Sequence, residues 1–261
     1  MDIVSHSAGG FELPPIRRIT SEQPWLWLAA GWRDLRLHPA LSLGYGLAVV
    51  MASYALTAAL IYFGAIYLLL PLAAGVVFAG PMLAVGLYEI SRRIETGESI
   101  TLRRVLFVTT HSPEHIGSMA LILALFMLVW VRIATLLFAL FFGLGAPPLG
   151  QIIQTLLFTT DGLEFLILGS AIGGILALLA FATCAISIPR LMVRQTDVVT
   201  AIATSITAVT RNLGPMLLWA WLIAMLTVVG IATCYIGLIV IFPLIGHATW
   251  HAYRDLVDEP A

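Results

Sequence analysis

IGSMALILALFMLVWVRIATLLFALFF, residues 116–142, is the stretch that decides the class of this protein. As a helix it would be about 40 Å long at about 1.5 Å per residue, more than the ~30 Å hydrocarbon core of a bilayer. It contains one charged side chain, Arg132, and no proline. Such a stretch predicts a helix that crosses a membrane.

Five further spans are expected around it. Three stretches are equally apolar, and they run from about Leu41 to Phe63, Ala65 to Tyr88, and Leu163 to Ile188. The block from Leu213 to Ile245 has no charge and would be about 50 Å long as one helix, too long for one span even when tilted. A break near Gly230–Gly237 would give two spans, the second continuing to about Tyr253. We therefore expect an all-α polytopic membrane helix bundle of about six transmembrane helices in three hairpins, with five spans as the alternative.

The composition supports this class. Hydrophobic residues make up 60% of the 261 and charged residues 10%, against about 45–50% and about 25% in ordinary soluble domains. The net charge of −1 provides no electrostatic footprint for nucleic acid. The first 24 residues lack the apolar core of a signal peptide. We expect residues 1–20 to be a disordered cytoplasmic tail, 21–257 a single six-span membrane domain, and 258–261 a second short tail.

Basic residues predict the orientation. All of them are arginines, and twelve of the thirteen lie in alternate connections or near the chain ends: Arg17, Arg18, Arg33, Arg36, Arg92, Arg93, Arg103, Arg104, Arg190, Arg194, Arg211 and Arg254. Cytoplasmic loops are enriched in Lys and Arg. The pattern predicts a multi-pass membrane protein with both termini in the cytoplasm.

Each expected hairpin follows an amphipathic segment that ends near a proline. These segments are PWLWLAAGWRDLRLHP (24–39), TLRRVLFVTTHSP (101–113) and DVVTAIATSITAVTRNLGP (197–215). Helical spacing places large apolar residues on one stripe, which is Trp25, Leu28, Trp32 and Leu35 in the first segment and Val199, Ile202, Ile206, Val209 and Leu213 in the third. We expect these stripes to lie in the headgroup layer. The alternative is ordinary cytoplasmic helices packed on the bundle.

Four segments resemble a known family. They are GWRDLRLHPALSLGYG (31–46), GPMLAVGLYEISRRIETGE (80–98), VWVRIATLLFALFFG (129–143) and GPMLLWAWLIAMLTVVG…FPLIGHATWHAYRDLV (214–230 and 242–257). They are similar to a bacterial family of predicted integral membrane proteins known as domain of unknown function 2189, over about Ile16 to Val257. The resemblance implies a multi-span inner-membrane protein with no established reaction, and it supplies no catalytic residues.

Arg132 is the first candidate for a functional site. A charge inside a span is costly and usually faces the bundle interior or a cavity, with a partner. The nearest acidic residues by position are Asp161 and Glu164, at the outer start of the fourth span. Together they could form an anion or headgroup site, or a gating ion pair. The alternative is an arginine that extends to the interface or makes one structural salt bridge.

The connection 143–162 is the only long segment on the outer side. Its middle, LGQIIQTLLF (149–158), is too short to span and predicts a re-entrant or interfacial helix. Beside Arg132 it could line an outer vestibule; alternatively it is a lid that only packs against the bundle.

Histidines at the cytoplasmic ends are weaker candidates. His247 and His251 are four residues apart and share a helix face, a workable spacing for metal ligands. His111 and His115 have the same spacing, but Pro113 interrupts helical geometry between them. A metal or haem site would need these pairs to converge; otherwise the histidines hydrogen-bond to backbone and water.

The ends of two spans carry similar side chains. Tyr88 and Glu89 precede Arg92, and Tyr253 precedes Arg254. We expect an ion pair between these ends to join the first and last hairpins. Small residues at four-residue spacing, Gly44–Ala48–Ala52 and Gly169–Gly173, predict close helix packing.

These observations favour a non-enzymatic role. No phosphate-binding loop, nucleophile elbow or pair of carboxylates is evident, so we expect neither catalysis nor a cofactor. The spans hold almost no polar groups, so we expect an accessory or assembly component of a membrane complex, with the bilayer and a membrane-protein partner or second copy as its contacts. One alternative is a small-solute or ion transporter or channel, with a site near Arg132 and a second span broken at Pro71 and Pro81. Another is a histidine-based metal or haem protein.

Overall fold

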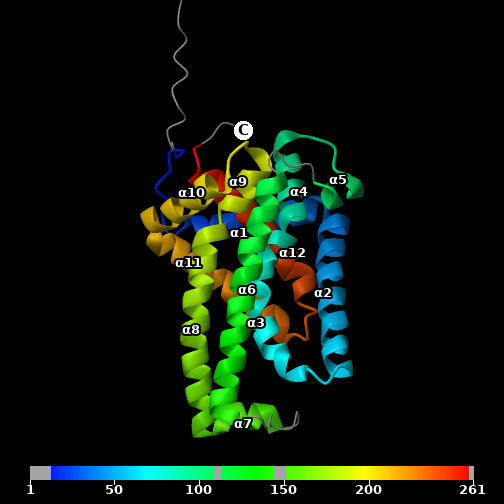
Figure 1. Ribbon diagram of the computed structural model, residues 1–261. Coiled ribbons are helices and arrows are strands. Elements are labelled where there is room, and N and C mark those ends of the chain that lie inside the picture. Colours follow the sequence, from blue (N-terminus) through cyan, green and yellow to red (C-terminus); the bar gives the residue numbers. More distant parts are fainter. Residues whose placement is uncertain (1–12, 109–112, 144–150, 259–261) are drawn as a thin grey trace, which may run out of the picture.

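The computed structural model describes residues 13–108, 113–143 and 151–258. Within these ranges the chain is helical apart from turns and one isolated β-bridge, between Ile16 and Val257. The expected all-α helix bundle is therefore confirmed. Its long helices run along a common direction in Figure 1, and most of the short ones gather at one end.

Five segments of the described chain are long and apolar enough to cross a membrane: Pro39–Tyr62, Pro71–Thr96, Pro113–Phe142, Thr160–Val193 and Leu213–Ala232. The first, third and fifth are the helices α2 (Pro39–Tyr62), α6 (Pro113–Phe142) and α11 (Leu213–Ala232). The second joins α3 (Leu69–Leu83) to α4 (Val85–Thr96), and the short 3-10 helix η1 (Ile66–Leu68) precedes it. The fourth joins α8 (Thr160–Cys184) to α9 (Ser187–Val193).

The break expected in the last apolar block is present. Cys234 and Tyr235 adopt positive φ angles of 53° and 67° and turn the chain back. The helix α12 (Leu238–Leu256) then returns to the end where α11 began. Its second half carries His247, His251 and Arg254, so α12 is not among the five segments apolar enough to span. The expected sixth span is thus a helix that is apolar in its first half only.

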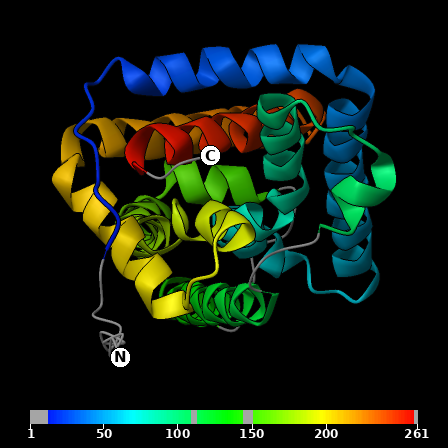
Figure 2. The ribbon, with the colours of Figure 1, turned by 90° about the horizontal axis from the view of Figure 1, so that it is seen from above.

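Short helices cover both ends of the bundle. One end holds α1 (Gln23–Leu37), α5 (Leu102–Leu106), α9 and α10 (Val198–Arg211), and we call it the arginine-rich end because the twelve arginines other than Arg132 belong to it. Seen from above in Figure 2, α1 and α10 lie along two sides of the molecule. At the opposite end α7 (Ile152–Phe158) lies across the bundle, as expected for a segment too short to span. Residues 144–150 of that connection lie outside the described ranges.

The amphipathic helices α1 and α10 expose much of the apolar stripe that we expected to lie in the headgroup layer. In α10 most buried residues are small or polar (Ala201, Thr204, Ser205 and Ala208). Of the expected stripe, Val199 and Ile206 are exposed and Val209 is buried. In α1 the side chains of Trp27 and Asp34 are buried, whereas Trp25 and Trp32 are exposed. Most of each large apolar stripe therefore faces away from the bundle, while Leu35 and Val209 pack inside, and this geometry is compatible with helices that lie in an interface.

Glycines bring α12 close to its neighbours. A Cβ added to Gly46 of α2 would lie 2.2 Å from the carbonyl oxygen of Ile239, and one added to Gly31 of α1 would lie 2.8 Å from the nitrogen of Ala248. The expected packing glycine Gly44 instead faces open space, as does Gly169. Gly173 does pack closely, because the ring of Trp130 fills the space beside it.

Packing divides the bundle into two parts. At the arginine-rich end α1, α4 and α12 pack together closely, and Trp27 meets Trp219 edge to face with ring centroids 5.6 Å apart. Farther into the apolar part, α3, α6 and α8 form one group, while α2, α11 and α12 form another. A cavity of about 110 Å³ lies between the two groups.

Candidate functional site

Five polar residues meet inside the arginine-rich end, and we call them the polar cluster: Asp34, Ser42, Ser91, His247 and His251. They come from four helices, α1, α2, α4 and α12. All but His251 are fully or almost fully buried. Buried polar side chains are costly unless they are hydrogen-bonded, so such a cluster fixes the mutual positions of the helices that supply it.

His247 is the centre of this cluster. Its Nε2 lies 3.0 Å from Ser42 Oγ, and its Nδ1 lies 2.8 Å from Ser91 Oγ. A serine hydroxyl can donate or accept, so one serine can donate to the bare ring nitrogen while the other accepts from the ring N–H. The neutral imidazole is therefore fully hydrogen-bonded without contact with solvent. This arrangement ties α12 to α2 and α4 at once.

Asp34 and His251 form the second half of the cluster. Asp34 Oδ2 lies 2.8 Å from His251 Nε2, and 20% of the His251 side chain is exposed. Burial by itself raises the pKa of Asp34, but the hydrogen bond and charge of His251, assisted by Ser91, outweigh it and lower the pKa below its ordinary value. Asp34 Oδ1 is buried and has no hydrogen-bond partner among the described residues; its nearest cation is Arg33, 3.9 Å away.

Local structure explains why these residues converge. Trp27, Gly31, Asp34 and Leu35 share the buried face of α1, and Gly31 lets that face approach the backbone of α12. Four-residue spacing then places His247 and His251 on adjacent turns of the facing helix. Sequence reasoning had named both histidines, but as ligands for a metal or haem.

The sequence did not predict the other three members of the polar cluster, which are Asp34, Ser42 and Ser91. Asp34 lies between Arg33 and Arg36, outside the apolar stripe expected for this segment. The available signal was the spacing of Trp27, Gly31 and Asp34, a large, a small and a polar residue on one face. The two serines had no signal, because only the tertiary fold brings them to His247.

The expected ion pair between the span ends exists with a different carboxylate. Arg254 Nε donates to Glu95 at 2.9 Å, and Trp250 Nε1 donates to the other oxygen of Glu95 at 3.1 Å. Glu89 instead accepts from Arg92 and Arg93 of its own helix. Glu89 lies one to two turns closer to the apolar part of the bundle than Glu95 does. The two adjacent arginines of α4 already form ion pairs with the Glu89 carboxylate, so it does not pair with Arg254.

Tyr88 has a different environment from the one we expected. Its ring is buried, and its hydroxyl has no hydrogen-bond partner among the described residues. The residue lines the cavity between the two helix groups instead of joining an ion pair.

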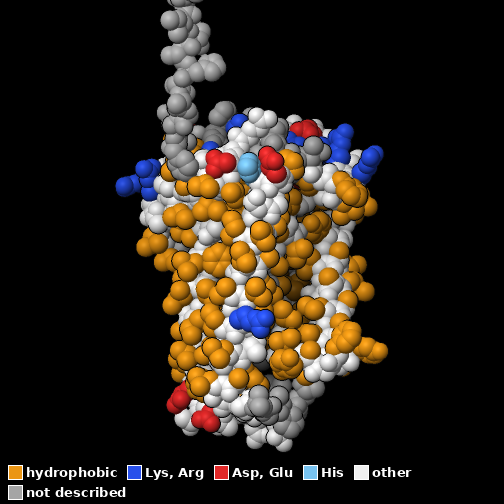
Figure 3. Space-filling view, viewed as in Figure 1, with side chains coloured by type: hydrophobic (Ala, Val, Ile, Leu, Met, Phe, Trp, Pro, Cys, Tyr) orange, Lys and Arg blue, Asp and Glu red, His pale blue; other side chains and the backbone are white. Residues whose placement is uncertain are grey.

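Arg132 is exposed on α6, and the structure brings neither Asp161 nor Glu164 to it. Phe165 of α8 packs against Phe138 and Phe142, which places the acidic residues level with the end of α6. Phe142 is ten residues beyond Arg132, a separation of about 15 Å along a helix. The expected ion pair is therefore absent from the described residues. Figure 3 shows a basic patch surrounded by hydrophobic side chains, and acidic groups at the end of the molecule opposite the arginine-rich end.

The histidines do not converge as metal ligands in the described ranges. No group of three His, Cys, Asp or Glu side chains there is arranged to hold a metal ion. Both ring nitrogens of His247 are engaged by serines. His115 lies near Glu114 at the start of α6, and His111 falls outside the described residues.

Comparison with known proteins gives one match. The model of a family described as "Predicted integral membrane protein (DUF2189)" matches residues 69–193, from α3 through α9. No curated protein and no solved structure matches the chain. The matched segment contains Tyr88, Ser91 and Arg132, whereas Asp34 and both histidines of the polar cluster lie outside it. Over residues 69–193 the chain is similar to the DUF2189 family of predicted integral membrane proteins, the family that its sequence led us to expect.

Proposed function

We propose that this protein is a non-enzymatic accessory component of a membrane protein assembly. The observation that carries the proposal is Arg132, an exposed guanidinium in the middle of an apolar helix with no hydrogen bond or ion pair to any described residue. Insertion scales put the cost of a central arginine at about 2.5–3.5 kcal/mol. A carboxylate on a neighbouring transmembrane helix would offset that cost.

The surroundings of Arg132 fit a helix-on-helix contact. Leu128, Arg132, Leu136 and Leu140 follow one another at four-residue spacing on α6, and all four are exposed; we call them the α6 stripe. A partner helix that lies along this stripe would find apolar contacts on both sides of the arginine. The partner is therefore expected to be a transmembrane helix with one acidic residue at mid-depth.

Photo-crosslinking of the full chain in its native membrane tests this contact. A benzoylphenylalanine at Leu136 should give a defined adduct, whereas the same probe at Leu47, an exposed apolar residue of α2, should not. Arg132→Leu should reduce the adduct by about tenfold or more, as for loss of one partner of a charge pair. Arg132→Glu should restore it when the partner's carboxylate is replaced by arginine. Absence of a Leu136 adduct, or an adduct that is insensitive to Arg132→Leu, would reject the proposal.

A transporter with a site near Arg132 is less well supported, because this side chain points away from the bundle. Proteoliposomes that contain the wild type and Arg132→Ala separate the two functions. Solute flux that requires Arg132 would favour transport over an accessory role.

We also propose that the arginine-rich end faces the cytoplasm of a bacterial inner membrane. Both described chain ends lie there, since Arg17 pairs with Asp258, and the bias of arginines obeys the positive-inside rule. Alkaline phosphatase fused after Ala261 should be inactive, and a fluorescent protein at the same position should be fluorescent. An active phosphatase would reverse the orientation.

A further inference from the structure

The cavity between the two helix groups has an almost entirely apolar wall. Six elements line it, including α3 with Val77 and Gly80, α8 with Cys184, α11 with Trp219 and α12 with Ile241. Its volume is about 110 Å³. An engineered apolar cavity of about 150 Å³ in another protein stays dry and binds benzene, so a space of this size and character suits a single small ring.

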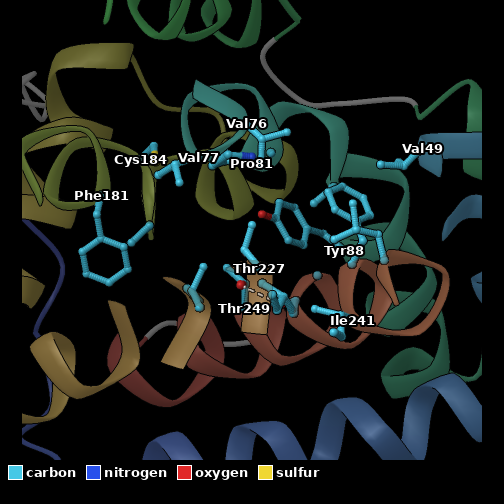
Figure 4. A pocket seen from close by; sticks show the side chains of 18 of the residues that line it. Val49, Val76, Val77, Pro81, Tyr88, Phe181, Cys184, Thr227, Ile241 and Thr249 are labelled. Carbon is cyan, nitrogen blue, oxygen red and sulfur yellow. Dashed lines mark hydrogen bonds between the residues drawn. The ribbon is translucent and has the colours of Figure 1, made fainter. Parts of the chain in front are cut away.

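One polar group points into this space without a partner. Figure 4 shows the hydroxyl of Tyr88 directed toward the centre of the cavity, among side chains from α3, α11 and α12. Tyr88 is only 3% exposed, and no described residue accepts or donates a hydrogen bond at its hydroxyl. A tyrosine hydroxyl in apolar surroundings normally finds a hydrogen-bond partner, and the Tyr88 hydroxyl is open to one only from the cavity.

In the part of the cavity wall that α3 forms, a proline interrupts the helical hydrogen bonding. Pro81 has no N–H and cannot donate to the carbonyl of Val77 four residues earlier, as a helix would require. Both residues line the cavity, on the wall that also contains Gly80. Added atoms at Gly80 would meet nothing within 4 Å, so this wall faces open space.

We propose that this cavity is a binding site for a small, neutral, lipid-soluble molecule that has a six-membered ring and one hydrogen-bond-accepting oxygen. The apolar walls hold the ring, and the Tyr88 hydroxyl donates to the oxygen. Such a molecule partitions into the bilayer and reaches the cavity between helix groups that pack only loosely on each other. This inference is independent of Arg132 and of the accessory role.

A pair of fluorinated probes tests the assignment in the full chain reconstituted in nanodiscs. 4-Fluoroacetophenone has the ring and the accepting oxygen, whereas 4-fluoroethylbenzene has a similar shape without the oxygen. Fluorine NMR titrations measure the two Kd values after subtraction of the signal from empty nanodiscs. The wild type should bind the ketone saturably and about tenfold more tightly, the usual contribution of one buried hydrogen bond.

Two variants identify the site. Tyr88→Phe should bring the two Kd values to within about twofold, because only the hydroxyl distinguishes the probes. Tyr62→Phe, which changes a tyrosine that is 84% exposed on α2, should behave as wild type. Gly80→Leu, whose added Cβ would meet nothing within 4 Å, should place apolar atoms in the cavity and abolish binding of both probes. Non-saturable binding, equal affinities in the wild type, or a preference that survives Tyr88→Phe would each overturn the proposal.

Discussion

The arginine-rich end of the bundle is closely packed and hydrogen-bonded, whereas the apolar part is packed less closely. At the arginine-rich end, helix backbones approach closely over glycines, and every ring nitrogen of His247 has a partner. In the apolar part, two helix groups leave a cavity between them, and the Tyr88 hydroxyl has no hydrogen-bond partner among the described residues. Lipid tails give apolar helices little reason to associate, whereas buried polar groups must find partners. The polar cluster, more than apolar contact, therefore fixes the arrangement of the helices.

The largest effect is expected where backbones touch. Gly46→Leu places a side chain where even a Cβ would lie 2.2 Å from the Ile239 carbonyl oxygen, so α2 must separate from α12. We expect a loss above about 4 kcal/mol, enough to prevent folding. The yield of monodisperse protein by size exclusion chromatography measures it.

Gly44→Leu is the matched control for that change. It lies on the same helix, and an added Cβ would meet nothing within 4 Å. It should therefore purify as the wild type does. Equal yields of the two variants would show that α2 and α12 do not pack as closely as described.

Breaking the buried pair should have the next largest effect. Asp34→Leu removes the carboxylate that His251 Nε2 contacts at 2.8 Å and should lower stability by about 3 kcal/mol. Chemical unfolding in detergent checks this. A variant as stable as the wild type would mean that the buried carboxylate does not hold α1 against α12.

The same carboxylate predicts how stability depends on pH. Because the pKa of Asp34 is lowered in the folded protein, its stabilising contribution is present above the ordinary aspartate value of about 3.9 and is lost as the pH falls through the folded value. His251 and His247 on α12 and Arg33 on α1 are the charged or titratable groups around it.

Melting temperatures measured between pH 7 and pH 3 test this contribution of Asp34 to stability. The wild type should lose stability below about pH 4, and Asp34→Asn should lose less of it over the same interval. Asp161→Asn, at an exposed aspartate of α8, should leave the profile unchanged. Parallel profiles for the wild type and Asp34→Asn would contradict the assignment.

Much of the fold followed from apolar length alone. The five spans and the turn after α11 lie close to where the sequence predicts them. The faces of the amphipathic helices were predicted in part. Val199 and Ile206 of the expected stripe are exposed, as a stripe in the headgroup layer would be, whereas Val209 of the same stripe packs inside.

The candidate site was harder to predict. His247 and His251 could be found from their spacing, but their partners come from α1, α2 and α4, and no local pattern connects these helices. Gly46 and Gly44 illustrate the same limit, since only tertiary structure shows which of the two faces a neighbour. Arg132 was recognised as exceptional, but its outward orientation depends on the rotation of α6 in the bundle.

A direct comparison of the two regions tests the central claim. His247→Leu leaves Ser42 and Ser91 without their buried hydrogen-bond partner. Tyr88→Phe removes a hydroxyl that makes no hydrogen bond to any described residue. Unfolding of both variants in the same detergent should show a loss of about 2–3 kcal/mol for His247→Leu and a change within about 0.5 kcal/mol for Tyr88→Phe. Similar losses for both, or a larger loss for Tyr88→Phe, would contradict the claim that the polar cluster holds the helices together.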